Sequence, residues 1–346
     1  MDILITGGNG FLGHNLIEAL QARGDRVRVL ALPQENTDWL EARGVQVFRG
    51  DIREAAALTE PMRGVEGVFH LAAMLGAWRS MQEYRDVNVT GTEHVCRAAL
   101  AAGVKRLVHI SSAMVYDMAM GRPVTEDDPL QPLDEPYCMT KAEGDALVQR
   151  LIAWEQLPAV ILRPGTLFGP GDRLNFGRIA DRVKAGKMII IGSGNNAVPF
   201  VYIDDMVQAL LLALDHERAV GQAFNVGNDH PLSQAELYNT IAREIGAPPV
   251  RTHVPYAPLY AAAAAAERVA NLTNNRILPP VTRHGVKLYG AHNLLSIDKA
   301  RRELGYAPTM PLREGLRITS EWYVRQQEQA AAHATVNAQQ ALPARR

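Results

Sequence analysis

The sequence predicts an α/β fold, a doubly wound parallel sheet that carries a smaller C-terminal lobe for substrate. Three observations predict it. Short runs rich in β-branched residues alternate with helical runs through the first half of the chain. A glycine-rich turn directly follows the first of those runs. Beyond residue 170 the alternation loosens, which indicates that a separate lobe begins there.

The alternation defines the expected elements of the sheet domain. Strands are expected at residues 3–6, 27–32, 45–49, 67–71, 107–111 and 159–163. Helices are expected between them at residues 16–22, 37–43, 58–62, 84–102 and 137–154. Successive βαβ units with right-handed crossovers give a parallel sheet, and ligands of such sheets bind beyond the carboxyl ends of the strands.

The whole chain is expected to divide between the sheet domain, the lobe and a tail. Residues 1–169 form the expected dinucleotide-binding domain, with a return element at about 199–228. Residues 170–198 and 229–325 form the expected substrate lobe. In this lobe the apolar run 257–266 is predicted to be a buried or lid helix. The Ala- and Gln-rich tail, residues 326–346, has no periodicity and is predicted to be disordered.

The glycine-rich turn has the spacing G-x-x-G-x-x-G. Its glycines are Gly7, Gly10 and Gly13, and Phe11 and Leu12 stand between the last two. A turn that opens a helix gathers unpaired N–H groups at the positive end of the helix dipole, where a phosphate can bind. Such glycines can also serve strand–helix packing alone, so the turn by itself leaves both interpretations open.

Two further motifs supply reactive groups. Ser111 and Ser112 follow the strand-like run, and Tyr137 precedes Lys141 by one helical turn, so the Tyr and Lys side chains share a face. A free tyrosine has a pKa of about 10, and a nearby ammonium favours the phenolate. Ser112 can hydrogen-bond a substrate oxygen, Tyr137 can exchange a proton with the substrate, and Lys141 can activate the tyrosine. These groups suit hydride transfer, whereas strand-end capping is the alternative for the serines.

Several more segments give the chain a resemblance to the extended short-chain dehydrogenase/reductase superfamily. They are residues 50–53, 70–73, 88–92, 163–165, 200–205, 224–227 and 300–305. That superfamily includes nucleotide-sugar epimerases and dehydratases, 3β-hydroxysteroid dehydrogenases and dihydroflavonol reductases. The resemblance covers most of residues 1–325 and implies a Rossmann-type fold, a small-molecule substrate and an NAD or NADP cofactor. It also implies a homodimer formed through the helices at 84–102 and 137–154.

The resemblance assigns the cofactor contacts as well. Beside the glycine turn, the implied contacts are Asp51 on the adenine, Ile52, Leu71, Ala72, Ala73, Tyr137, Lys141, Pro164 and Thr166. For Asp51 a solvated turn is the alternative. Ala31 stands where NAD-binding folds commonly place an acid for the ribose. Because no Lys or Arg lies between Arg28 and Arg43 to meet a 2′-phosphate, NAD is preferred over NADP.

Departures from the superfamily's patterns narrow the reaction. The similar 4,6-dehydratases carry Asp and Glu directly after the catalytic threonine, where this chain has Ala113 and Met114, so dehydration of that kind is not expected. Val198 and Thr166 stand where sugar-nucleotide enzymes place an Arg and an Asn, and the Arg clamps the pyrophosphate. The cations that could substitute are Arg173, Arg178 and Arg283.

The leading hypothesis is therefore NAD(P)-dependent interconversion of a secondary alcohol and a ketone on a mostly apolar small molecule. Residues 279–290 and the apolar run 257–266 resemble the hydroxysteroid dehydrogenase and dihydroflavonol reductase members, whose substrates are apolar. A nucleotide-sugar 4-epimerase using the same triad is the first alternative. A cofactor-binding sensor or scaffold without turnover is the second, although it has no need of Tyr137 together with Lys141.

Composition argues against other classes of function. A net charge of −1 offers no electrostatic surface for nucleic acid, and no run reaches the ~18 apolar residues of a membrane span. The two cysteines, Cys96 and Cys138, make neither a disulfide framework nor a metal cluster, which suits a cytoplasmic location. No metal site is expected, and Cys138, without a dedicated base, is predicted to be a small filler. Asn88 is expected to be structural, and Asp204 and Asp205 to cap a helix.

Overall fold

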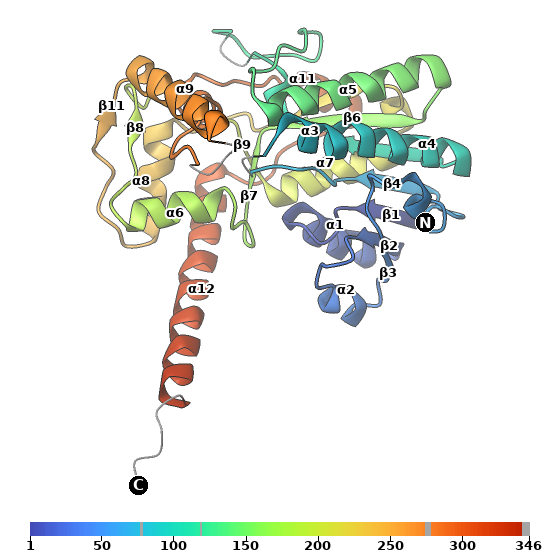
Figure 1. Ribbon diagram of the computed structural model, residues 1–346, viewed down its shortest axis with the longest axis horizontal. Helices are drawn as coiled ribbons and strands as arrows, with labels where there is room; N and C mark the ends of the chain where they lie inside the picture. The colour runs from blue at the N-terminus through green and yellow to red at the C-terminus, as the bar shows by residue number, and fades with distance from the viewer. Residues whose placement is uncertain (77–78, 118–119, 274–277, 341–346) are drawn as a thin grey trace.

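A seven-stranded parallel sheet forms the centre of the computed structural model (Figure 1). The structure describes residues 1–76, 79–117, 120–273 and 278–340, and for 333–340 the backbone alone. The strands lie in the order β10-β6-β5-β4-β1-β2-β3. Their bounds are β1 Asp2–Thr6, β2 Arg26–Ala31, β3 Gln46–Arg49, β4 Gly67–His70, β5 Arg106–Ile110, β6 Ala159–Pro164 and β10 Ala223–Val226. This order is the doubly wound arrangement of dinucleotide-binding folds with one added strand, and it confirms the predicted fold class.

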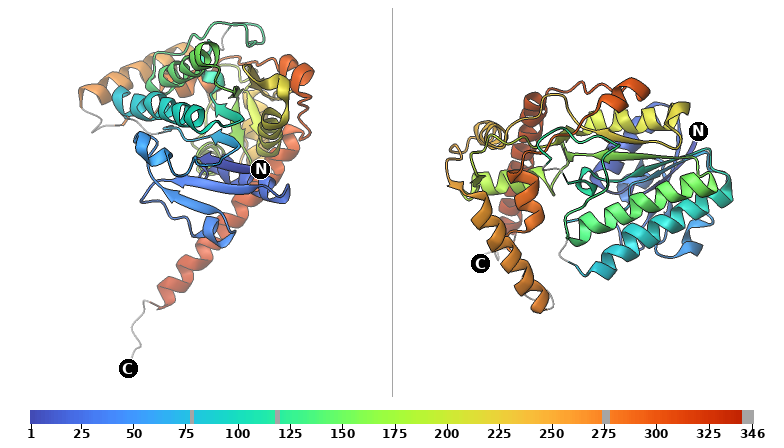
Figure 2. Two further views of the ribbon diagram at one scale, coloured as in Figure 1. Left: turned by 90° about the vertical axis from the view of Figure 1, so that its right-hand side faces the viewer. Right: turned by 90° about the horizontal axis from the view of Figure 1, so that it is seen from above.

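Helices cover both faces of the sheet because successive side chains of a strand point to opposite faces. On one face Ile3 and Ile5 share a core with α1 (Phe11–Ala22), α7 (Ile203–Asp215), α11 (Asp298–Leu304) and the short α2 (Asp38–Ala42). On the other face Leu4 shares a core with α4 (Thr92–Ala102) and α5 (Pro136–Glu155). Helices α4 and α5 lie side by side in Figures 1 and 2.

The lobe begins where the chain leaves β6. Two short parallel strand pairs belong to it: β7 (Thr166–Phe168) with β9 (Phe200–Tyr202), and β8 (Ile190–Ile191) with β11 (His253–Val254). Its helices are α6 Phe176–Lys184, α8 Gln234–Glu244, α9 Tyr256–Leu272, α10 Arg283–Gly290 and α12 Leu312–Gln340. Phe176, Tyr238 and Leu316 are fully buried in its core. The sequence Ser-Gln-Ala-Glu from residue 233 by itself predicts a helix start, and Ser233 and Glu236 form the capping box that begins α8.

The tail that was expected to be disordered from residue 326 is instead helical as far as Gln340, where α12 ends. Ala and Gln favour the helical backbone even without a periodic apolar face, which is the physical reason for the difference. The second half of α12 extends away from the rest of the protein (Figure 1). Residues 341–346 lie outside the described part of the chain.

Residues near the C-terminus complete the core of the sheet domain. Leu304 and Tyr306 are buried on the face of α1 and α7, and the Tyr306 hydroxyl donates to the Gly227 carbonyl at 2.8 Å. Asp205, in the first turn of α7, accepts hydrogen bonds from the backbone N–H groups of Thr309 at 2.7 Å and Met310 at 3.3 Å. This segment packs with the sheet rather than with the lobe to which it was assigned. Asp205 was expected to cap its own helix. Its carboxylate instead anchors the later segment of the chain.

The helix expected at 84–102 has an irregular beginning. A short helix, α3 (Met81–Arg85), passes through a π-helical turn at Asp86–Gly91 before α4 starts. A Cβ at Gly144 of α5 would lie 2.5 Å from the Asn88 carbonyl oxygen, so the absence of a side chain there lets α5 approach this turn.

Within the described residues, no helix has the length and apolar character to cross a bilayer.

Candidate active site

A cavity of ≈ 340 Å³ lies at the carboxyl ends of β1, β4, β5 and β6, the edge at which ligands of doubly wound sheets bind. It brings together most of the residues that the sequence nominated. Those in its wall are Gly7, Gly10, Phe11, Leu12, Gly13, Leu71, Ala73, Ser112, Tyr137, Lys141, Pro164 and Thr166. Segments far apart in the chain therefore meet at one place, as expected from the positions of these residues at strand ends.

Three of the nominated cofactor contacts lie outside this wall. The Asp51 carboxylate is engaged by the Arg53 guanidinium at 2.7 and 3.0 Å, and this hydrogen bonding lowers the pKa of Asp51. Ile52 is buried, and its carbonyl oxygen lies 3.0 Å from Nδ1 of His94. Ala72 presents its backbone to Gly7. Their contacts to a cofactor remain predictions.

The glycine turn has the geometry that a phosphate cradle requires. Gly7 has a φ of +74°, and a Cβ there would lie 2.6 Å from the backbone nitrogen of Ala72. A Cβ at Gly13 would lie 2.4 Å from the Gly8 carbonyl oxygen, so the turn closes tightly on the start of α1. Gly10 is the N-cap of α1 and has no side chain to occupy the first N–H groups of the helix. The residues present therefore fit a dinucleotide pyrophosphate.

Lys141 is almost fully buried beside the cavity. Only 4% of its surface is exposed, and its Nζ donates to the carbonyl oxygen of Ile110, the last residue of β5, at 2.6 Å. Burial lowers the pKa of Lys141 to about 8, against an opposing attraction from Asp145. The ammonium is therefore held at a fixed place near the sheet edge, and it loses its proton at a lower pH than an exposed lysine does.

Burial governs Tyr137 as well. It raises the pKa of the phenol to about 12, and a hydrogen bond with Ser112 opposes the rise. The Ser112 hydroxyl accepts from the backbone N–H of Met114 at 3.1 Å, which fixes its orientation at the end of β5. Burial therefore has the largest effect on the pKa of Tyr137 in the structure, and its activation by Lys141 remains a prediction.

Asn88 supports the site from the π-helical turn. Its side chain is buried, its Oδ1 accepts from the Met74 N–H at 2.8 Å, and its Nδ2 donates to the Met74 carbonyl at 3.2 Å. The same Nδ2 donates to the Thr140 hydroxyl of α5 at 3.1 Å. Both ends of the amide are thus used to hold the loop after β4 against the helix that bears Tyr137 and Lys141, which agrees with a structural role.

Much of the cavity wall is apolar. Leu75, Met114, Leu174 and Leu288 lie in the wall with Ser112 and Tyr137. Val198, at the position of the expected pyrophosphate clamp, is buried in the core of the lobe instead. The substitution of Val for Arg therefore removes a cation without creating another polar contact in this cavity.

Of the three arginines that could replace the clamp, one is in position. Arg178 of α6 lies in the cavity wall. Arg283 is committed to Glu267 at 2.6 Å and to the Asp134 carbonyl at 2.9 Å, and Arg173 donates to Gln326 at 3.3 Å. The sequence alone does not choose among the three, because their distances from the cavity depend on how the lobe folds.

Comparison with known proteins identifies the group to which these features belong. A profile of the NAD dependent epimerase/dehydratase family matches residues 3–227. The chain belongs to this family. A 2-alkyl-3-oxoalkanoate reductase of Stenotrophomonas maltophilia is 35% identical over 327 residues, covering 92% of this chain and 98% of the relative. Isoform 1 of the 3beta-hydroxysteroid-dehydrogenase/decarboxylase of Arabidopsis thaliana is 30% identical over 342 residues, covering 91% of this chain and 78% of that relative.

A solved structure of the family supports the assignment in three dimensions. The dTDP-glucose 4,6-dehydratase DesIV of Streptomyces venezuelae, with NAD and TYD bound, has a TM-score of 0.77 to this chain at 26% identity. The match covers 95% of this chain and 98% of the other. This epimerase/dehydratase family member is therefore an enzyme of the extended short-chain dehydrogenase/reductase type, as the sequence motifs predicted, and NAD(H) is the cofactor that the comparisons support.

Proposed function

We propose that the protein is a ketoreductase, or in reverse a secondary-alcohol dehydrogenase, for a mostly apolar small molecule. The observation that supports this most is the combination in one cavity of Ser112 and Tyr137 with a wall of Leu75, Met114 and Leu174. Apolar side chains favour an alkyl or ring substrate over a sugar, whose hydroxyls would lose their hydrogen bonds to water. The reductases and hydroxysteroid dehydrogenases among its relatives point the same way.

In the proposed reaction the chain's own groups handle the carbonyl oxygen. Bound NADH would supply the hydride. Ser112 donates a hydrogen bond to the ketone oxygen and so orients it toward Tyr137, whose phenol gives up the proton as the alkoxide forms. The Lys141 ammonium stabilises the phenolate that is left and, when the cofactor is bound, holds its nicotinamide ribose. The raised pKa of Tyr137 keeps the phenol protonated at neutral pH, which suits the direction of reduction.

Arg178 suggests what the head of the substrate carries. It is exposed on α6, and within the described residues no ion pair joins it to a carboxylate, although its charge favours the ionised form of the buried Asp172 in the same wall. We therefore propose that it meets an acidic head group, as in the 2-alkyl-3-oxoalkanoates named for one relative. Arg178→Gln should raise KM for an alkyl 3-oxo acid at least tenfold and leave KM for the matching neutral ketone unchanged. Equal effects on both substrates would remove Arg178 from this role.

NAD is the preferred form of the cofactor in this proposal. The structure brings one cation to the loop after β2 that the sequence did not indicate. This cation is Arg49 at the end of β3, whose guanidinium donates to the Glu35 carbonyl. Its guanidinium already donates to the carbonyl oxygens of Leu32 and Glu35 and to the Thr37 hydroxyl, so it is not free for a 2′-phosphate. Measured with one ketone, kcat/KM should be higher for NADH than for NADPH.

Nucleotide-sugar 4-epimerisation is the second candidate, since Arg178 could also meet a pyrophosphate in the same cavity. One experiment separates the two. An alkyl 3-oxo acid should oxidise NADH stoichiometrically, as seen in the nicotinamide absorbance, while UDP- and dTDP-sugars should neither react nor raise the melting temperature. A ligand at 100 times its Kd stabilises by about 2.7 kcal/mol, so binding would be visible. Interconversion of a sugar without net oxidation of cofactor would replace the proposal with the epimerase.

A further inference from the structure

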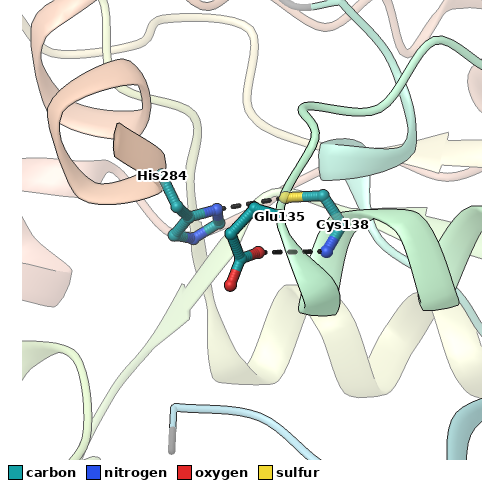
Figure 3. A group of neighbouring side chains, drawn as sticks. All are labelled: Glu135, Cys138 and His284. Atoms are coloured by element: carbon teal, nitrogen blue, oxygen red, sulfur yellow. Dashed lines mark hydrogen bonds between the residues drawn. The ribbon is translucent and has the colours of Figure 1, made fainter. Parts of the chain in front are cut away.

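Three side chains of types that commonly bind metal ions converge beside Tyr137, outside the cavity described above. Glu135 and Cys138 belong to the start of α5, and His284 comes from α10 of the lobe (Figure 3). Their donor atoms all lie within 4.8 Å of one another. The Cys138 Sγ is 3.2 Å from His284 Nδ1, so this cysteine has an imidazole partner 146 positions later in the chain, which the sequence did not reveal.

The donor set is the kind that zinc prefers. Zn²⁺ takes thiolate sulfur at about 2.3 Å and imidazole nitrogen or carboxylate oxygen at about 2.0–2.2 Å. Two donors on a tetrahedral ion are then separated by about 3.4–3.6 Å. The observed distance of 3.2 Å between Sγ and Nδ1 needs only a small opening to admit the ion. Glu135 already faces Cys138, because one of its carboxylate oxygens accepts from the Cys138 backbone N–H at 3.2 Å.

We propose that Glu135, Cys138 and His284 form a binding site for Zn²⁺ that joins the lobe to the catalytic helix. A small cavity of ≈ 10 Å³ adjoins Cys138 and His284, which is room for a single water as the fourth ligand. The thiol would release its proton to solvent as it coordinates, so two anionic ligands would balance the charge of the ion. Lys287, the nearest cation in that cavity, is held by Asp117 at 2.7 Å.

The position of the site gives the ion a structural consequence. Helix α10 contributes His284 to the site and Leu288 to the wall of the large cavity. The Tyr137 ring stands edge-on to the His284 ring, with 5.9 Å between centroids. An ion bound here would therefore fix a lobe helix against the first turn of α5. Zinc should stabilise the folded protein by mass action, whatever substrate the enzyme takes.

Zinc binding can be measured on the intact protein. Protein treated with a chelator is titrated with Zn²⁺ in competition with a chromophoric chelator, and one ion per chain is expected. Cys138→Ser, His284→Gln and Glu135→Gln should each weaken binding at least tenfold, and Gln at 135 keeps an oxygen to accept from the Cys138 N–H. Cys96→Ser, which removes the other buried thiol, and His253→Gln, in β11, should bind as the wild type does.

Two further readouts keep the proposal testable if a variant folds poorly. Zn²⁺ should raise the melting temperature of the wild type and of Cys96→Ser but not of His284→Gln. Co²⁺ in place of zinc should give the near-ultraviolet charge-transfer band of a cobalt thiolate. Wild-type affinity in both Cys138→Ser and His284→Gln, or a cobalt complex without that band, would overturn the site.

Discussion

Arg163 and Asp145 form a two-pronged ion pair that is almost completely shielded from water. Nε and Nη2 of Arg163 each donate to one carboxylate oxygen at 2.8 Å, and the two side chains are 2% and 0% exposed. Arg163 lies in β6, and Asp145 lies on α5 one helical turn beyond Lys141. The arginine also donates to the Tyr116 hydroxyl, which donates to Asn225 of β10 at 3.0 Å. This network fixes α5 to the sheet.

Replacing Asp145 by Asn should destabilise the protein by about 3 kcal/mol, because a guanidinium without its counter-charge would remain buried. The free energy of unfolding in urea measures this loss. Lys105→Ala, which breaks an exposed pair with Glu66, is the matched control and should change it little. Equal stability of Asp145→Asn and wild type would mean that the ion pair does not hold α5 in place.

Tyr137→Phe should reduce turnover by roughly 10² or more, since it removes the proton donor and leaves the ring in place. NADH affinity, measured by fluorescence titration, should change little because the phenol is not the group that holds the phosphates. The edge contact with His284 is also preserved by Phe. A Phe variant with near-wild-type kcat would refute the assignment of Tyr137.

Lys141 should make stability depend on pH in the alkaline range. Below about pH 8 both the folded and the unfolded chain carry its proton, but between pH 8 and 10.5 only the unfolded chain still does. Stability from this group therefore rises with pH across that interval, by up to about 3 kcal/mol. Lys141→Met lacks the effect, so its stability relative to wild type should fall as the pH is raised from 7 to 10. Parallel unfolding curves at the two pH values would show that Lys141 is not desolvated.

Trp154 should lie in a two-fold interface. It is 78% exposed near the end of α5, the helix that packs beside α4. We propose that these helices pair with the same helices of a second copy, which would bury that ring. Sedimentation at micromolar concentration should give a dimer for the wild type and a monomer for Trp154→Glu. Leu272→Glu, on an equally exposed side chain of α9, should remain dimeric.

The sequence was most predictive where one local rule determines the structure. The alternation of strands and helices predicted the parallel sheet. The start of α8 follows from the capping box, a motif of four consecutive residues from Ser233 to Glu236. The triad could be nominated because its members stand at strand ends or one helical turn apart. These features need no knowledge of distant contacts.

The remaining features depend on contacts between distant segments. The approach of His284 to Cys138 depends on how the lobe folds back over α5, which no local pattern encodes. Asp205 looked like a helix cap because its partners, Thr309 and Met310, come about a hundred residues later. The high pKa of Tyr137 follows from burial, and burial is a property of the assembled site rather than of the Tyr-x-x-x-Lys spacing.

The late segment that carries Leu304 and Tyr306 limits how this enzyme can be made and modified. While only residues 1–230 have emerged from the ribosome, the apolar surface that Leu304 and Tyr306 cover is exposed. This part of the chain therefore cannot complete its core until residues 304–306 follow. For the same reason a lobe from a relative cannot be grafted as one continuous block after β10. A chimera would have to return to the host sequence before Ile297 and leave it again after Met310, so that Asp205 keeps its partners.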